Sequence, residues 1–266
     1  MIYYLAQGKS PLLVSMPHVG TLIPNPFRME FVPRALDVED TDWHLDRLYH
    51  FVKQLGASEL RGVHSRYIID LNRPPDDAPM YPGASITELW PTRFFTGDLL
   101  HVPGAAPTAE QRVMLRKTYW EPYHEALRAE LDRIKAQHGY ALLWDAHSIR
   151  SEIPWLFEGV LPGLNIGTAN GESADPRITQ AVADAAARHP AISHVVNGRF
   201  KGGYTTRHYG KPADHVHAVQ LEMSQYLYMS EEPPYEYNWS KAQAIKPVLM
   251  EMMTAALDAC RAIYGK

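Results

Sequence analysis

The chain of 266 residues is long enough for one large α/β domain or two small ones, and either could bury a sizeable core. With 45% hydrophobic and 21% charged residues, its composition is typical of a folded globular protein and excludes the disordered and fibrous classes. A formal net charge of −4, without any basic cluster, argues against nucleic acid as a partner.

The first predicted element is a buried strand at 11–17, where the apolar run PLLVSMP ends in a proline. The carboxyl end of this strand delivers His18 into a loop. A helix is predicted over 41–55, because leucines recur there at helical spacing and Gly56 is a natural stop. Asp42 then falls in the first turn of that helix.

Two strands around a turn near Gly62 are predicted within 57–72. The second strand, YIIDLN, ends in the polar pair Asn72 and Arg73, directly before two prolines. The region 74–107 is rich in proline, glycine and aromatic residues, so we expect an ordered meander over the surface. No domain boundary is predicted there.

The most regular helix begins with a capping box formed by Thr108 and Gln111 and continues along an apolar stripe to about Gly139. The run YALLWDAHS follows it and predicts a buried strand. The carboxyl end of this strand presents Asp145 and His147. The second histidine is therefore expected at a strand end, like the first.

A helix is predicted to begin at Asp175, followed by a strand at 192–196, and then the segment 200–210 interrupts the regular pattern. The run HAVQLEMS predicts a strand that carries Glu222. Ser240 is expected to cap the final helix. No internal repeat or low-complexity tract is present.

Strands that alternate with helices of this length predict a single domain over 1–266, a three-layer α/β/α sandwich with a mostly parallel or mixed sheet. In such folds ligands bind beyond the carboxyl ends of the strands. His18, Asn72, His147 and Glu222 all fall at or near predicted strand ends. We therefore expect these side chains to converge.

The sequence also indicates the cellular compartment in which the protein is expected. No stretch approaches 18 uninterrupted apolar residues, and the N-terminus lacks the charged and apolar regions of a signal peptide, so no membrane partner is expected. The single cysteine, Cys260, cannot form an intramolecular disulfide, which fits a reducing compartment. We expect a cytoplasmic protein. The sequence leaves its oligomeric state open.

Two histidines and a carboxylate are the ligands that a catalytic zinc ion prefers, with a fourth position left to water. His18, His147 and one acidic residue meet that requirement, although a lone histidine after a strand equally often caps a loop. Asp42 is the preferred carboxylate and Asp40 the reserve. An aspartate in the first turn of a helix is also favoured by the helix dipole alone.

Asn72 and Arg73 are suited to carboxylate recognition, because guanidinium meets carboxylate through two parallel hydrogen bonds. A structural salt bridge to a nearby aspartate is the alternative.

Glu222 lies between apolar neighbours, and burial raises a carboxyl pKa toward the range of a general base. An outward-facing glutamate on an edge strand is equally consistent with this pattern. Arg207 and His208 follow two glycines and are predicted either to contact an anion or transition state, or only to solvate a turn.

Six segments, in this order along nearly the whole chain, resemble the N-formylglutamate amidohydrolase (deformylase) family: SMPHVG, DTDWH, YIIDLNRP, LLWDAHSIRS, NGRFKGGYTTRHYG and AVQLEMSQYLYM. The resemblance implies a phosphorylase/hydrolase-like fold related to zinc carboxypeptidases and aspartoacylases. It implies hydrolysis of N-formyl-L-glutamate to formate and L-glutamate, the last step of one histidine-degradation route. Zinc, or another divalent ion in its place, is the implied cofactor.

The same resemblance implies roles for five residues. His18 and His147 occupy the places of metal-binding histidines, and Asn72 with Arg73 resembles the pair that holds a substrate carboxylate. Glu222 resembles the base. The chain lacks the H-x-x-E spacing of carboxypeptidases, so the carboxylate ligand must come from elsewhere.

The implied mechanism has Glu222 take a proton from the attacking water and return it to the leaving amine. The metal, with Arg207 or His208, would stabilise the tetrahedral oxyanion. Two alternatives remain at this level: an aspartoacylase-like deacylase of another N-acyl amino acid, and a non-catalytic binder of small acidic metabolites.

Overall fold

The computed structural model describes residues 1–80 and 87–265, and these residues form a seven-stranded sheet in the order β1-β3-β2-β4-β7-β5-β6. The strands are β1 (Tyr3–Ala6), β2 (Leu12–Met16), β3 (Ser58–Gly62), β4 (Ala141–Ile149), β5 (Leu164–Gly167), β6 (His194–Val196) and β7 (Val216–Ser224). β3, β2, β4 and β7 are parallel, as are β5 and β6, whereas β1 is antiparallel to β3 and β5 to β7. The sheet is therefore mixed, as predicted.

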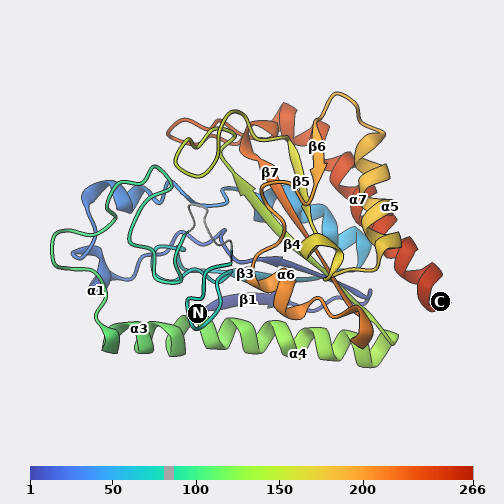
Figure 1. The fold of residues 1–266 in the computed structure, drawn as a ribbon, viewed down its shortest axis with the longest axis horizontal. Coiled ribbons are helices and arrows are strands. Elements are labelled where there is room, and N and C mark those ends of the chain that lie inside the picture. The colour runs from blue at the N-terminus through green and yellow to red at the C-terminus, as the bar shows by residue number, and fades with distance from the viewer. Residues whose placement is uncertain (81–86, 266) are drawn as a thin grey trace.

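Helices cover both faces of this sheet (Figure 1). The α-helices are α1 (Asn25–Arg28), α2 (Leu45–Leu48), α3 (Ala109–Leu115), α4 (Glu121–His138), α5 (Pro176–Ala187), α6 (Tyr204–Tyr209) and α7 (Trp239–Tyr264), and a π-helical turn, Arg116–Trp120, joins α3 to α4. Short 3-10 helices are Pro33–Asp37, Tyr49–Leu55, Ala169–Gly171, Pro212–Asp214 and Gln225–Leu227. α3 and α4 lie along one face, and α5 and α7 along the other (Figure 1). The predicted three-layer α/β/α fold is confirmed.

Alternation along the central strands builds the two cores. Leu12 and Trp144 pack in the cluster that includes α5 and α7, whereas Leu13 and Leu143 pack in the cluster that includes α4. Successive side chains of a strand point to opposite faces, so an uninterrupted apolar run serves both layers. All nine residues of β4 are buried. The site that follows these strands is consequently held by the most enclosed part of the sheet.

Several predicted boundaries are confirmed. The capping box of Thr108 and Gln111 is present at the start of α3, and α4 ends at Gly139 in the left-handed conformation. Asp175 caps α5. The predicted strand at 192–196 is shorter, since only His194–Val196 pairs.

The helix predicted over 41–55 is wrong at its start. His44 has a φ of 60°, a left-handed conformation that interrupts a helix, so α2 begins only at Leu45 and gives way to a 3-10 helix at Tyr49. Asp42 therefore lies in the preceding loop, where its backbone N–H donates to the carbonyl of His18 at 3.0 Å. The carboxylate is positioned by this contact and not by a helix dipole.

The second strand predicted within 57–72 is also wrong. After β3 the chain forms turns, in which the N–H of Ile68 donates to the carbonyl of Ser65 at 2.9 Å and that of Asp70 to Leu89 at 2.8 Å. The apolar run is buried without a strand partner, so burial and not strand pairing explains its composition. Asn72 consequently belongs to a turn.

Three further differences concern shorter elements. The segment 200–210, expected to be irregular, contains helix α6, and the cap of α7 is Asn238 and not Ser240. Strands β1 and β5, each four residues long, were not predicted. The predicted meander 74–107 has no helix or strand in its described part, and 81–86 lie outside the described residues.

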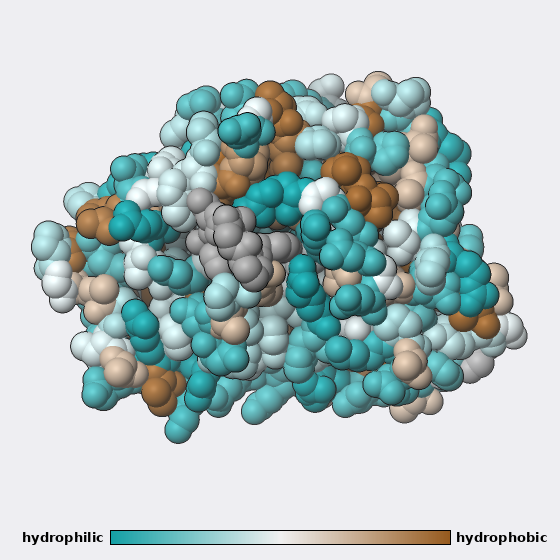
Figure 2. Space-filling model, viewed as in Figure 1, coloured by the Kyte–Doolittle hydropathy of each residue, from teal (hydrophilic) through white to brown (hydrophobic). Residues whose placement is uncertain are grey.

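The face shown in Figure 2 is mainly hydrophilic, with hydrophobic residues gathered in separate small patches. Within the described part of the chain, no helix combines the length and the apolar character that a membrane span requires.

Candidate metal centre and active-site pocket

His18 follows β2 and is almost fully buried, with 3% of its surface exposed. Its Nε2 lies 2.7 Å from Oδ1 of Asp70, whose other oxygen accepts from Arg66 at 2.6 Å. A carboxylate at Nε2 assigns the ring proton to that nitrogen and leaves the lone pair on Nδ1. This Nδ1 is buried and has no hydrogen-bond partner among the described residues.

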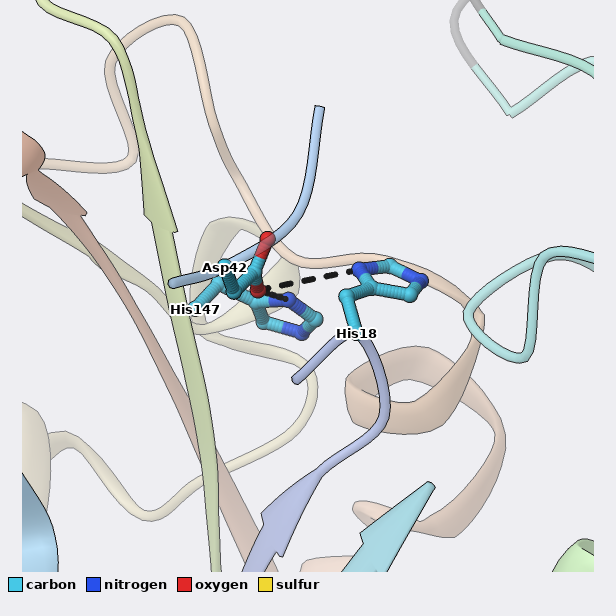
Figure 3. A group of neighbouring side chains, drawn as sticks. All are labelled: His18, Asp42 and His147. Carbon is cyan, nitrogen blue, oxygen red and sulfur yellow. Dashed lines mark hydrogen bonds and ion pairs between the residues drawn. The ribbon is translucent and has the colours of Figure 1, made fainter. Parts of the chain in front are cut away.

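His147, in β4, approaches the same point from the neighbouring strand. Its Nδ1 lies 3.1 Å from Oδ2 of Asp42, and its Nε2 lies 3.1 Å from Oδ2 of Asp145. The Oδ2 of Asp42 is also 3.7 Å from Nδ1 of His18. Figure 3 shows both imidazole rings with a nitrogen turned toward the Asp42 carboxylate.

His18, Asp42 and His147 form what we call the His–Asp–His group, in which one ligand atom from each residue lies within 4.8 Å of the others. Two imidazole nitrogens and one carboxylate oxygen are a donor set that suits zinc. The buried Nδ1 of His18, without a partner among the described residues, is the atom that such an ion would satisfy. The residues therefore fit a divalent metal.

Neighbouring charges shift the pKa values of the side chains around the His–Asp–His group. Burial alone would raise the pKa of Asp70, but His18 and the Arg66 guanidinium hold it well below its usual range. Burial alone would lower the pKa of His147, yet Asp145 and Asp42 raise it well above its usual range. Each histidine is thus backed by a carboxylate, the arrangement that orients imidazole ligands in metal sites.

Glu222 lies on β7 in register with His147 of β4 and lines the same pocket. Only 8% of the residue is exposed. Burial raises the pKa of the Glu222 carboxyl to about 8, and the charge of His147 opposes this rise. A carboxyl group with such a pKa is able both to take up and to release a proton near neutral pH.

The pocket above these residues encloses about 590 Å³ of empty space, part of which is open to solvent. Its lining is mixed, with three arginines, two phenylalanine rings, two histidines and several other polar groups. The lining residues are His18, Arg66, Asn72, Arg73, Thr87, Phe95, His147, Ser148, Ile149, Leu156, Arg199, Phe200, Gly203, Gln220 and Glu222.

Asn72 and Arg73 enter this pocket from their turn. The Asn72 side-chain nitrogen lies 3.0 Å from Nε2 of His147. The Arg73 guanidinium donates to the Thr87 hydroxyl through two nitrogens, at 3.1 and 2.5 Å. Its backbone carbonyl accepts from the indole N–H of Trp120 at 3.0 Å, and Trp120 ends the π-helical turn. The structure therefore brings the predicted pair beside the His–Asp–His group.

Gly203 allows the close approach that fixes Asn72. A Cβ at position 203 would lie 2.3 Å from the Asn72 side-chain nitrogen, inside van der Waals contact. The N–H of Gly203 donates to Gln220 at 2.7 Å, and the N–H of Thr205 donates to Oδ1 of Asn72 at 2.8 Å. Only glycine leaves room for this network.

Three predicted residues lie elsewhere. Asp40 is buried and accepts from Tyr67 and from the Phe95 backbone, both at 2.9 Å, so it is not part of the His–Asp–His group. His208 is 2.8 Å from Arg128 at the surface, and Arg207 donates to the Gly202 carbonyl. Neither Arg207 nor His208 is among the described residues that line the pocket.

Sequence reasoning assigned no role to Arg66, Asp70, Asp145 or Arg199. Asp145 was placed at the strand end with His147, and alternation along the strand puts the two on the same face, which was a usable signal. Arg66 and Asp70 are four residues apart in a segment predicted to be a strand, so their salt bridge was not foreseen. The position of Arg199 in the sequence did not indicate that it would line the pocket.

A mixed α/β sheet brings two histidines, an aspartate and a buried glutamate beneath one charged pocket, the arrangement expected of an α/β enzyme of the hydrolase class. The family model for N-formylglutamate amidohydrolase matches residues 10–229. The chain belongs to this family and is an amidohydrolase.

Relatives agree with this assignment. An N-formylglutamate deformylase from Pseudomonas putida is 50% identical over 251 residues, which cover 94% of both chains. One from Pseudomonas aeruginosa is 49% identical over 259 residues, or 97% of both. The crystal structure of an N-formylglutamate amidohydrolase from Ralstonia eutropha JMP134 shares the fold, with a TM-score of 0.81 at 22% identity, covering 99% of this chain and 98% of that one.

Proposed function

We propose that this enzyme hydrolyses N-formyl-L-glutamate to formate and L-glutamate in a zinc-dependent reaction, as the last step of a histidine-degradation route in the cytoplasm. The observation that carries the proposal is the His–Asp–His group beside Glu222. It occurs in a chain that is 50% identical to an N-formylglutamate deformylase.

His18, Asp42 and His147 would hold the metal, through Nδ1 of each histidine and a carboxylate oxygen. A bound zinc ion supplies Lewis-acid chemistry, which lowers the pKa of water and polarises a carbonyl oxygen. Asp70 accepts from Nε2 of His18 and thereby leaves Nδ1 of that ring free of a proton on the metal side, whereas Asp145 lies 3.1 Å from Nε2 of His147 as an ion-pair partner.

Glu222 is the proposed proton carrier. Its carboxylate takes the proton from the water that attacks the formyl carbon. It then donates this proton to the amide nitrogen as the C–N bond breaks, which releases the amine of glutamate and formate. Burial supports both steps, because it raises the pKa of Glu222 to about 8.

Asn72 and Arg73 are proposed to hold a substrate carboxylate. Arg73 lines the pocket, and the Thr87 and Trp120 contacts hold its side chain and backbone. For the oxyanion of the tetrahedral intermediate we propose Arg66, which lines the pocket 3.8 Å from Asp42. The role predicted for Arg207 or His208 has no support from their placement.

The test measures formate release and zinc content on one preparation of purified protein. We expect about one zinc per chain and rapid formate release from N-formyl-L-glutamate, with N-acetyl-L-glutamate turned over at least 100-fold more slowly. Faster turnover of the acetyl compound would favour a deacylase. Binding of N-formyl-L-glutamate without turnover or zinc would favour a non-catalytic binding protein.

A further inference from the structure

The positive charges of the pocket fall into two groups. Arg66 is enclosed with carboxylates, since it donates to Asp70 at 2.6 Å and lies 3.8 Å from Asp42. Arg73 and Arg199 line the same pocket and donate to the Thr87 hydroxyl and the Leu156 carbonyl, respectively. The proposed substrate carries two carboxylates, so each has a candidate guanidinium partner.

Arg199 follows β6, and its side chain is held against an apolar wall. Its Nε–H donates to the carbonyl of Leu156 at 3.1 Å, which fixes the orientation of the guanidinium plane. The guanidinium carbon lies 5.2 Å from the centre of the Phe200 ring. Leu156 and Phe200 belong to one hydrophobic cluster with Phe95. Beside apolar groups a guanidinium attracts a carboxylate more strongly than it does in water.

The two arginines differ in the segments that hold them. Arg73 is adjacent to Asn72, whose side chain touches His147. Arg199 is attached instead to the Leu156 segment. In N-formyl-L-glutamate the α-carboxylate is close to the formyl group, whereas the side-chain carboxylate is two methylene groups further away. Arg73 therefore matches the α-carboxylate.

We propose that Arg199 binds the side-chain carboxylate of the substrate and thereby selects an acidic N-formyl amino acid. This inference rests on the proposed function for the identity of the acyl group. The inference assigns the preference for a second carboxylate to one residue, Arg199. This preference can therefore be measured separately from catalysis.

The test compares N-formyl-L-glutamate with N-formyl-L-glutamine, which has the same shape and a neutral amide. Arg199→Met should lower kcat/KM about 100-fold on the glutamate compound and less than threefold on the glutamine compound. Arg199→Lys should keep part of the preference. Arg73→Met, the matched control, should lower both substrates about equally, because both carry the α-carboxylate. Equal losses on both substrates in Arg199→Met would overturn the proposal.

A binding measurement separates this inference from the reaction itself. In a Glu222→Gln background, calorimetry should show tighter binding of N-formyl-L-glutamate than of N-formyl-L-glutamine, and Arg199→Met should abolish the difference. If the wild-type protein released no formate, the proposed function would fail, while this loss of preference would still support the role of Arg199. An unchanged preference in Arg199→Met would refute it, provided that thermal unfolding shows a folded variant.

Discussion

Each histidine of the His–Asp–His group contacts a second carboxylate through its other ring nitrogen. Asp70 contacts His18 and Asp145 contacts His147, each at the ring nitrogen turned away from Asp42. Such contacts fix the tautomer and the direction of the lone pair, and they raise the basicity of the ligand. These two buried aspartates are expected to matter for metal affinity although neither belongs to the ligand set.

Asp70→Asn should therefore weaken zinc binding about 10–100-fold while the three ligands remain. Competition against a zinc chelator measures this affinity. Asp46→Asn is the matched control, because that carboxylate is exposed and contacts Arg61 at 3.0 Å and the Arg47 backbone N–H at 2.9 Å, away from the His–Asp–His group. Zinc affinity in Asp70→Asn within twofold of the wild type would contradict the supporting role.

Glu222→Gln should retain zinc and lose about 10²–10⁴-fold in kcat, because the amide cannot take a proton from water. Steady-state formate release and metal analysis on the same sample give both quantities. The exposed Glu236→Gln is expected to behave like the wild type. A near-wild-type rate in Glu222→Gln would refute its assignment as the proton carrier.

His124 predicts an acid-sensitive fold. Burial lowers its pKa to about 3, and its Nε2 lies 2.8 Å from the carbonyl of Leu71. The unfolded chain binds the proton near pH 6.5, so stability is fully present above that pH and is lost as the pH falls toward 3. The free energy of unfolding should fall there by up to about 1.4 kcal/mol per pH unit from this residue.

Chemical unfolding between pH 7 and pH 4 measures that slope. His124→Gln should be less stable than the wild type at pH 7 and should show a shallower slope. The exposed His50→Gln should leave the slope unchanged. An unaltered slope in His124→Gln would show that other groups cause the acid sensitivity.

The connection between β6 and α6 packs directly on Asn72, because Gly203 has no side chain to keep them apart. Gly203 has a φ of −83°, so alanine there adds a clash and no backbone strain. Gly203→Ala should displace Asn72 and lower kcat/KM at least tenfold, as measured by formate release. Gly104→Ala, with a φ of +83° and open space around it, should cost about 1 kcal/mol in stability without loss of activity.

The central strands were predictable from the sequence because each is a buried apolar run followed by a polar residue. β2, β4 and β7 were found in this way, and they carry or precede His18, His147 and Glu222. The sequence also indicated Asp42 as the preferred carboxylate, but it placed this residue in the first turn of a helix, whereas Asp42 lies in a loop before α2.

Other features depend on contacts between distant segments. The run at 66–72 has the composition of a strand, but its backbone hydrogen bonds are made within turns and to Leu89. Arg199 lines the pocket and donates to the carbonyl of Leu156, 43 residues earlier in the sequence. The spacing of residues along the chain does not reveal such contacts. Of the arginines that line the pocket, only Arg73 was therefore predicted from the sequence.

At the scale of the whole molecule, the site draws residues from segments between positions 18 and 222, on both sides of the central strands. We propose, as the sequence predicts, that residues 1–266 unfold as one domain. A metal that binds only the assembled site would then stabilise the entire fold.

Chelation should accordingly lower the melting temperature, and zinc should restore it. At a zinc concentration about 100 times Kd the gain is about 2.7 kcal/mol, or about 5–10 °C for a chain of this size. Calorimetry measures the shift and should show one transition. In His18→Ala combined with His147→Ala the zinc-dependent shift should vanish; its persistence would place the metal elsewhere.

The position of β7 has a consequence for the order in which the chain is made. β7 lies between β4 and β5, although it follows both in the sequence. Until residues 216–224 have been synthesised, the facing edges of β4 and β5 have no strand between them, and β4 is a strand of nine residues that are all buried in the finished fold. Such edges invite pairing with other chains. We therefore expect the nascent protein to be prone to aggregation during synthesis of the segment between β4 and β7. The strand that carries Glu222 then joins β4 to β5 and adds the last of the pocket residues.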